Sequence, residues 1–532
     1  MATNEELPSE VDVVVIGTGM QESILAAACA RAGLSVLHID RNPFYGGCWG
    51  SSFHFRNIED WIRSAQDTTG TPQCAYELQE NEELIPAAGS QSTIRNVALF
   101  SSITMDEDPA EKENSSLRFI PGRKFSIDVV PKLLLSDGPM VKILRQSEAS
   151  RYLEFQYVDR FLCVGNDVDA VPLKITRVPC SKNEIAFSSI LTSMEKRMLQ
   201  KFLQFCMTWK AKREEVTVLF PNFKWEAYQD KPFSEFLASL RIAGTLKNII
   251  CEVIAILNED VNTVDALEAV CTFLESVGRM NNVPTPFLYT CYGSSELEQG
   301  FNRLCAVYGG IYCLDRPCEA FVINKTSKKC SAIISGGQKI ACKHVITSQD
   351  YIHKKESDLE EVVMKRAILL TDGSIQPPAD EHISFLNLRR LNPECAVGLL
   401  ETGYKANVTP KGFQFVQLTA KGSVTSGDPF APIVERLFRS DGNVTEGDER
   451  PRIWWSLKFD VIQRRLEAPA ENIGVVPAPD HSLDFGSVVS SAEAIFARFW
   501  PDLDFLPRKA NQAREEFEEY EEEAAVGEVE TS

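Results

Sequence analysis

The pattern of apolar residues near the N-terminus predicts a β–α–β unit. Residues 11–16 form a β-branched run that ends at Gly17, and a helical pattern follows over 22–32. A second apolar run occupies residues 35–40. Short continuous apolar runs bounded by glycine are typical of buried parallel strands. The order therefore predicts an α/β domain with a parallel sheet and helices on its faces.

The hydrophobic period becomes helical between residues 178 and 282. Over 190–209 apolar residues recur at spacings of three and four, on more than one face of the predicted helix. Similar patterns cover 246–257 and 264–277, and a Pro-Thr-Pro sequence at 284–286 ends them. Strand-like runs then return. This change predicts an all-helical domain inserted into the α/β domain.

Polar composition marks two further segments. Residues from about 56 to 120 hold a Thr-Thr-Gly-Thr-Pro turn and a charged run, which predict a polar insertion that is partly disordered. Seven glutamates between 515 and 523 predict a solvated acidic tail. The predicted organisation is a discontinuous domain I over 8–177 and 283–505, the insertion at 56–120, a helical domain II over 178–282, and a tail over 506–532.

Charge and targeting signals restrict the function classes. The 75 acidic and 55 basic residues give a net charge of −20, which repels nucleic acid and anionic lipid. No apolar stretch reaches the ~18 residues of a membrane span, and the N-terminus is polar and acidic. We therefore expect a cytosolic protein without nucleic-acid binding or stable membrane insertion.

Motifs for catalysis or metal binding are lacking in the sequence. The 15 cysteines are scattered and form no CxxC, and the six histidines have no HExxH spacing. Neither a P-loop nor a GxSxG elbow occurs. We predict reduced, buried thiols, no metal site and no catalytic residue.

One motif is similar to a dinucleotide fingerprint. Gly17 and Gly19 follow the first predicted strand, and Asp40 ends the second. Glu22 replaces the third glycine, and its carboxylate would repel a pyrophosphate at the helix N-terminus. We predict a degenerate motif that binds no cofactor, in which the glycines only make a tight turn. A flavin-dependent oxidoreductase stays open as the alternative from another functional class.

Several blocks of residues, in a fixed order, resemble the Rab escort and Rab GDP-dissociation-inhibitor family. The blocks are residues 15–24, 38–47, 125–134, 151–155, 194–203 and 286–312. They cover roughly residues 10–320, and a weaker resemblance continues to about 500. The resemblance implies a flavoprotein-like α/β domain of the FAD/NAD(P)-binding type, interrupted by an all-helical domain.

The resemblance also implies that GDP-bound Rab GTPases bind domain I through Tyr45, Glu296 and Arg303. Alternatively, Tyr45 packs on the glycine turn that follows it. Glu296 and Arg303 alternatively form a helix-surface ion pair, worth under about 1 kcal/mol. Ser295 and Glu298 stand where the family usually has glycine and proline, so the loop is expected to differ locally.

Two features favour the escort branch over the dissociation inhibitors, which remain an alternative. They are the 56–120 insertion and the amino-acid sequence of the 194–203 block. The escort branch implies a non-catalytic accessory component, component A of Rab geranylgeranyl transferase. Such a chain presents unprenylated Rab proteins to the transferase α/β heterodimer and keeps their geranylgeranyl lipid soluble. Phe202 or Phe205 is implied to contact the transferase. Alternatively both phenylalanines belong to the core.

Overall fold

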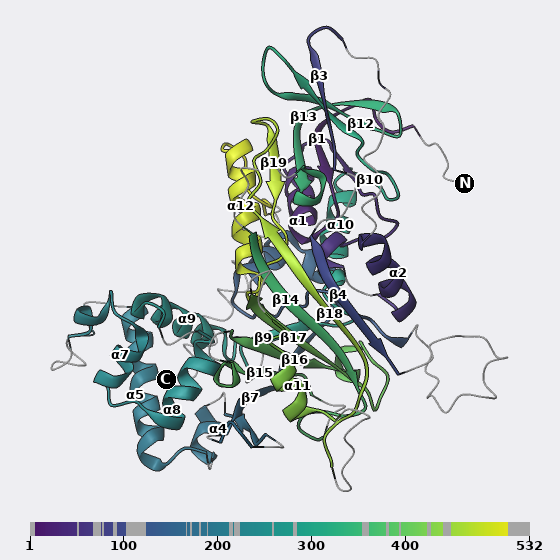
Figure 1. The fold of residues 1–532 in the computed structure, drawn as a ribbon. Coiled ribbons are helices and arrows are strands. Elements are labelled where there is room, and N and C mark those ends of the chain that lie inside the picture. Colours follow the sequence, from purple (N-terminus) through teal and green to yellow (C-terminus); the bar gives the residue numbers. More distant parts are fainter. Residues whose placement is uncertain are drawn as a thin grey trace, which may run out of the picture.

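The computed structural model of the 532-residue chain describes most of the sequence. The described residues are 6–50, 53–66, 76, 79–88, 93–102, 124–165, 167–170, 173–179, 182–188, 190–211, 216, 224–257, 260–279, 285–353, 361–378, 382–392, 395–422, 427–439 and 448–508. They form two large sheets, one small sheet and a lobe of helices (Figure 1).

The first sheet has a parallel centre and an antiparallel extension. Its strands follow the order β10 (Ile311–Cys313), β2 (Val36–Ile39), β1 (Glu10–Ile16), β13 (Gln338–Ser348), β12 (Cys330–Ser335), β11 (Ala320–Asn324) and β3 (Glu82–Pro86), and β19 (Ile473–Val476) pairs with β13. β1 is parallel to β2 and to β13. The helix α1 (Met20–Arg31) connects β1 to β2, which confirms the predicted β–α–β unit.

Helices cover one face of the parallel centre, and strands and loops cover the other. Every residue of α1 is buried, and α1 packs against α10 (Ser295–Val307) and α12 (Gly486–Phe499). Val13 and Val15 of β1 share one buried cluster with α1, and Val14 and Ile16 belong to a second cluster. Both faces of β1 are therefore covered.

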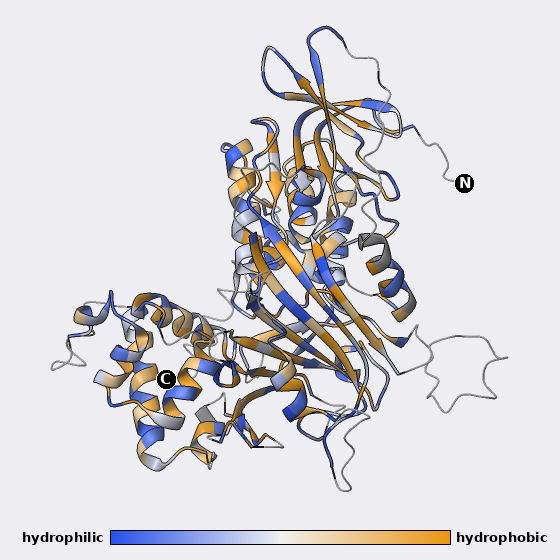
Figure 2. Cartoon of the chain, in the orientation of Figure 1, coloured by the Kyte–Doolittle hydropathy of each residue, from blue (hydrophilic) through white to orange (hydrophobic). Residues whose placement is uncertain are grey.

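The second sheet lies beside the first and is mainly antiparallel. Its order is β4 (Ile94–Ser101), β18 (Ile453–Arg464), β14 (Glu361–Thr371), β17 (Gln414–Gly422), β16 (Val397–Thr402), β15 (Ser384–Asn387), β7 (Arg160–Val164) and β8 (Ile175–Val178). Figure 2 shows hydrophobic and hydrophilic residues alternating along β18, as expected for a strand with two different faces. The helix α11 (Ala431–Leu437) covers one face of the sheet, where Leu369 and Ile433 share a buried cluster. That face is called the outer face below, and the opposite one the inner face.

The helical lobe falls inside the range 178–282. It contains α4 (Lys182–Phe187), α5 (Ser193–Ala211), α7 (Phe233–Ser239), α8 (Gly244–Ile249), the π-helical segment η7 (Ile250–Ile254) and α9 (Thr263–Ser276). Figure 1 shows this lobe at the end of the second sheet, away from the first. Among the helices of the described residues, none combines the length and apolar character that crossing a bilayer requires.

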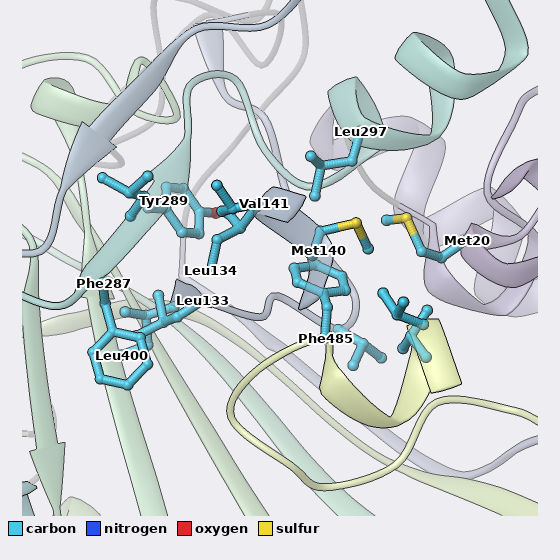
Figure 3. Packing of buried hydrophobic residues seen from close by; sticks show 14 of the residues in the cluster. Met20, Leu133, Leu134, Met140, Val141, Phe287, Tyr289, Leu297, Leu400 and Phe485 are labelled. Atoms are coloured by element: carbon cyan, nitrogen blue, oxygen red, sulfur yellow. The ribbon is translucent and has the colours of Figure 1, made fainter. Parts of the chain in front are cut away.

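One large core joins the helical lobe to domain I. Its buried residues include Phe205 and Leu267 of the lobe together with Met364 of the second sheet. The small sheet of β5 (Leu134–Leu135), β9 (Phe287–Thr290) and β6 (Phe155–Tyr157) contributes to the same core. Figure 3 shows Phe287 and Leu400 on one side of this packing and Met20 with Leu297 on the other.

Segments inside 56–120 are part of the fold rather than a separate polar insertion. The helix α2 (Phe55–Gln66) buries Ile58 and Trp61, β3 pairs with β11, and β4 pairs with β18. The partners of β3 and β4 lie hundreds of residues away, which is why the local composition did not reveal them. Residues 67–75, 77, 78, 89–92 and 103–123 lie outside the described residues.

Arg31, at the end of α1, joins the C-terminal segment to the core. Its Nε donates a hydrogen bond to the carbonyl of Pro507 at 2.5 Å, and its Nη1 donates to the carbonyl of Ser147. The guanidinium carbon lies 5.6 Å from the ring centre of Tyr308. Leu506 is fully buried. The predicted tail therefore begins too early at 506, because 506 and 507 belong to the fold, while 509–532 lie outside the described residues.

Candidate functional site: a polar platform on domain I

Tyr45, Glu296 and Arg303 meet around one shallow pocket. The pocket has a volume of about 390 Å³, and Tyr152 and Tyr312 also line it. Tyr45 comes from the loop after β2, whereas Glu296 and Arg303 both belong to α10. Three residues that the sequence placed at a common site are therefore neighbours in the structure. We call this pocket and its lining the platform.

Helix geometry explains why Glu296 and Arg303 face the same way. They are seven residues apart, about two turns of an α-helix, so they lie on one face of α10. The opposite face is buried against the core through Leu297 and Phe301. Gly300 allows the close approach of the chain before β6, because a Cβ there would lie 3.3 Å from the side chain of Leu153.

Arg303 is exposed and is oriented by an aromatic ring. Its guanidinium carbon lies 4.3 Å from the ring centre of Tyr152. Such a stack holds the cation without neutralising it. Between Glu296 and Arg303 the structure forms no ion pair, so the helix-surface pair considered from the sequence does not describe these two side chains.

Glu296 is half-buried in an acidic environment. Burial raises the pKa of its carboxyl, and the nearby carboxylate of Glu154 raises it further. A carboxylate in that position gains from a cationic or hydrogen-bond-donating partner, because such a partner replaces the water it has lost. Glu296 is thus a potential acceptor next to the exposed cation of Arg303.

Tyr45 lies at the edge of the platform above a glycine turn. Its ring meets Tyr312 edge to face at 6.3 Å between centres, and burial raises the pKa of its hydroxyl. Gly46 and Gly47 have φ of 107° and 51°, which side chains rarely adopt. The amide of Gly46 donates to the hydroxyl of Thr18 at 3.0 Å, so the turn is tied to the end of β1.

The two departures from the family pattern point into the protein. Ser295 and Glu298 are both buried. An oxygen of Glu298 lies close to Gly46, where a Cβ would approach it to 2.8 Å, and burial raises the pKa of this carboxyl well above its usual value. Both residues therefore belong to the packing beneath the platform and not to its surface.

The residues of the degenerate motif do not fit a dinucleotide. Glu22 is buried and its carboxylate folds back on Gly19, whose Cβ would lie 2.7 Å from Oε2 of Glu22. Burial raises the pKa of Glu22 to about 8, with smaller contributions from Asp40 and Asp350. A carboxyl therefore occupies the position that a pyrophosphate needs at the helix N-terminus.

Asp40 is also fully used within its own loops. Its Oδ2 accepts hydrogen bonds from the amide and hydroxyl of Thr18 at 2.8 and 2.6 Å. Its Oδ1 accepts from the amide and the side-chain nitrogen of Asn42 at 2.8 and 2.9 Å. The side chain that would hold a ribose in a dinucleotide site instead closes the turn around Gly17 and Gly19.

Phe202 and Phe205 are far from the platform and lie in the interior of the helical lobe. The side chain of Phe202 is 2% exposed, and its ring centre lies 6.4 Å from that of Phe233. The side chain of Phe205 is 1% exposed, and its ring centre lies 5.5 Å from that of Phe236. The wide apolar surface of α5 arises because α5 packs against α9 and, through these rings, against α7. The structure thus has both side chains in the core, the alternative that the sequence left open. A contact of either with the transferase stays a prediction.

Sequence reasoning missed two aromatic residues of the platform. Tyr152 stacks on Arg303, and Tyr312 supports Tyr45. Both belong to blocks that carry the family resemblance, 151–155 and 286–312, but their roles depend on contacts between distant segments.

Comparison with known proteins places the chain in a family. A sequence model of the GDP dissociation inhibitor family matches residues 6–87 and 78–433. Rab proteins geranylgeranyltransferase component A 1 from Caenorhabditis elegans is 38% identical over 512 residues, which cover 95% of this chain and 96% of that protein. The human component A 1 is 30% identical over 626 residues, covering 95% of this chain and 93% of the relative.

Solved structures show the same fold. The crystal structure of Rab GDI from Plasmodium falciparum superposes with a TM-score of 0.68 at 20% identity, covering 94% of this chain and all of that one. An oxidoreductase from Methanosarcina mazei has a TM-score of 0.52 at 12% identity, covering 91% and 99%. The predicted flavoprotein-like architecture is therefore confirmed. By its match to the family model and its similarity to these relatives along nearly its whole length, the chain belongs to the GDP dissociation inhibitor family, in the group of the Rab geranylgeranyltransferase component A proteins.

Proposed function

We propose that this chain acts as an escort for Rab GTPases. It binds unprenylated, GDP-bound Rab proteins, presents them to the α/β heterodimer of Rab geranylgeranyl transferase and keeps the prenylated product in solution until delivery to a membrane. The observation that carries the proposal is the convergence of Tyr45, Glu296 and Arg303 on one platform in a member of this family.

The chemistry of the platform suits a folded protein partner. Arg303 offers an exposed and oriented cation, Glu296 a half-buried acceptor, and Tyr45 an amphipathic ring. Tyr and Arg are the residue types that most often dominate protein–protein binding energy. Because a cation and a carboxylate lie side by side without pairing, a partner with complementary charges gains contacts to both.

The chain contributes binding surfaces, and the prenyl transfer itself belongs to the transferase. Glu22 and Asp40 are the positions where a flavoprotein of this fold would bind its dinucleotide. Here the carboxyl of Glu22 fills the space beside Gly19, and Asp40 is committed to internal hydrogen bonds. This supports a non-catalytic, accessory role. It also disfavours the flavin-dependent oxidoreductase, which predicts a yellow protein with flavin absorbance.

Holding the prenylated product in solution requires apolar surface for the lipid. Each buried methylene of a geranylgeranyl chain contributes about 0.8 kcal/mol. The interior of the helical lobe is aromatic, with Phe202 and Phe205 packed on Phe233 and Phe236. We propose that helices of this lobe part to accept the lipid.

A reconstitution tests the proposal and separates it from a dissociation inhibitor. Purified transferase, an unprenylated Rab protein and labelled geranylgeranyl diphosphate are mixed with or without this chain. Lipid incorporation that depends on the chain is the expected result. Binding of the Rab protein without any incorporation would assign the chain to the dissociation inhibitors instead. The Arg303→Ala variant should abolish stimulation if the platform is the binding site.

A further inference from the structure

A second, larger cavity lies between the inner face of the second sheet and the helical lobe. Its volume is about 500 Å³, within the range of roughly 300–1,000 Å³ that is typical of small-molecule sites. Met364, Phe385 and Leu400 line it from the sheet, and Phe273 lines it from α9. None of its lining residues belongs to the platform. Both domains therefore contribute to a mainly apolar chamber, with polar side chains such as Gln417 and Lys421 in its wall, separate from the proposed Rab site.

Arg366 brings a buried cation to this chamber. It is 1% exposed and points, like Met364 two residues before it on β14, to the inner face. Its nitrogens donate to the carbonyls of Val129 and Leu418, both at 3.1 Å, to the side-chain oxygen of Gln417 at 2.6 Å, and to the hydroxyl of Thr419.

These partners orient the guanidinium, and the buried carboxylate of Asp128 nearby favours its cationic form without touching it in an ion pair. Among the described residues no carboxylate lies within 4 Å of Arg366, and burial lowers the pKa of its guanidinium to about 9. Burial still destabilises the cation more than Asp128 compensates, because the pKa of the guanidinium is lowered, so an anion brought into direct contact with it would be stabilised there.

The acidic side chains of the lining have partners of their own. Asp480 pairs with the ammonium of Lys132 at 2.6 Å. Asp484 accepts a hydrogen bond from the amide of Gly486 at 2.6 Å. The chamber is therefore a mainly apolar space in which the acidic groups of the lining are already paired, and the carboxylate that acts on Arg366, Asp128, lies outside the lining.

The wall contributed by the helical lobe has an unusual backbone. The π-helical segment η7 leads into Ile256, which has a φ of 53°, a conformation that β-branched residues strongly disfavour. Glu252 of η7 pairs with Arg390 at 2.6 Å and so fixes this segment to domain I. Strain of this kind persists where the surrounding structure enforces it, and it concentrates at ligand sites.

We propose that this chamber binds one long apolar chain that ends in a carboxylate, as a free fatty acid does. The apolar walls of Met364, Phe385 and Phe273 would surround the chain, and the head group would meet Arg366. A small inorganic anion would leave those walls unfilled, and a neutral lipid would leave the buried guanidinium without an ion pair. The site is independent of the proposed Rab-binding platform.

Gly398 offers a position at the wall of the chamber where an added Cβ makes no close contact. It lies on β16 two residues before Leu400, on the inner face, and lines the chamber. A Cβ built there meets only Phe385, at 3.7 Å, which is an ordinary contact, and its φ is not in the left-handed region. Gly373 is a matched control, because its Cβ meets only Pro451 at 3.7 Å and it does not line the chamber.

The first experiment titrates the full chain with oleate below its micelle concentration and follows the heat of binding. We expect saturable binding in the unmodified chain, with the chamber as its tightest site. We expect Gly398→Leu to weaken oleate binding by about tenfold or more, and Gly373→Leu to leave it unchanged, with similar melting temperatures for all three proteins. Oleate binding by Gly398→Leu equal to that of the unmodified chain overturns the proposal.

The second experiment tests the head group. Oleate should bind the unmodified chain at least about tenfold more tightly than oleyl alcohol, and Arg366→Met should remove that difference. Equal affinities for oleate and oleyl alcohol in the unmodified chain overturn the role of Arg366 and make the chamber a site for neutral chains. This comparison decides the point even if Arg366→Met fails to fold.

Discussion

The guanidinium of Arg303 on α10 lies 4.3 Å from the ring centre of Tyr152, a residue of the short helical turn that precedes β6. Two segments that are distant in the sequence thus combine to hold one exposed cation. The relationship makes the platform partly ordered before any partner arrives, which reduces the side-chain entropy lost on binding.

Arg303→Ala should weaken Rab binding by about 2–4 kcal/mol, roughly thirtyfold to a thousandfold, because it removes an oriented interface cation. The melting temperature should stay unchanged, since the side chain is exposed. Titration of a GDP-loaded Rab protein measures the affinity. Arg177→Ala is a suitable control, because Arg177 is another exposed arginine, on β8 and outside the platform. Normal affinity of the Arg303 variant would remove it from the interface.

Tyr45→Ala should also weaken Rab binding. Tyr45→Phe removes only the hydroxyl, so it distinguishes the contribution of the ring to binding from that of the hydroxyl. If the ring is the contact, the phenylalanine variant keeps most of the affinity. If the hydroxyl donates a hydrogen bond to the Rab protein, that variant loses about 0.5–1.5 kcal/mol. Because Tyr45 is only half-buried against Tyr312, the fold should tolerate both changes. A fall in melting temperature that matches the loss of affinity would favour a packing role alone.

Glu22→Gln should make the chain more stable relative to the unmodified protein as pH rises. The folded chain keeps the Glu22 proton up to about pH 8, whereas the unfolded chain releases it near 4.5, so the unfolding free energy falls between these values. Glutamine has no proton to release. Denaturant unfolding of both proteins near pH 5 and near pH 8 should therefore show a gap that widens towards pH 8. A constant gap would mean that Glu22 is ionised in the folded protein.

Phe205→Ala should lower the unfolding free energy by about 3–5 kcal/mol, because it leaves a cavity beside Phe236. Phe202→Ala should behave similarly. Both variants should then impair the transferase and Rab interactions together with stability. Met194→Ala on the same helix is the control, since Met194 is 72% exposed and should change stability by under about 0.5 kcal/mol. Selective loss of transferase binding at full stability would instead support a direct contact by the phenylalanine.

The sequence predicted those parts of the fold that depend on local pattern. The run at residues 11–16 and the helix after it were recognisable because both faces of β1 are covered and therefore apolar. The pairing of β4 with β18 could not be recognised from the sequence. It joins Arg95 to Asp460, and nothing in the residues near either one indicates the other as its partner.

The same distinction applies to the site. Glu296 and Arg303 share a helix face, so their proximity follows from spacing alone. The stack of Tyr152 on Arg303 depends on how η4 (Ala149–Tyr152) packs against α10. That stack also decides where the guanidinium points, and it does not point to Glu296. Burial of Phe202 and Phe205 likewise depends on α7 and α9, which the α5 sequence does not encode.

The hydrogen bond from Arg31 to the carbonyl of Pro507 attaches the last described residues of the chain to the end of α1. The guanidinium of Arg31 also lies over the ring of Tyr308, the C-cap residue of α10. Arg31 therefore connects the C-terminal segment to the helix that carries the platform. The folded part of the chain therefore extends at least to residues 506 and 507. Removing them would expose the site where Leu506 is buried and remove a contact behind α10, the helix that carries the platform.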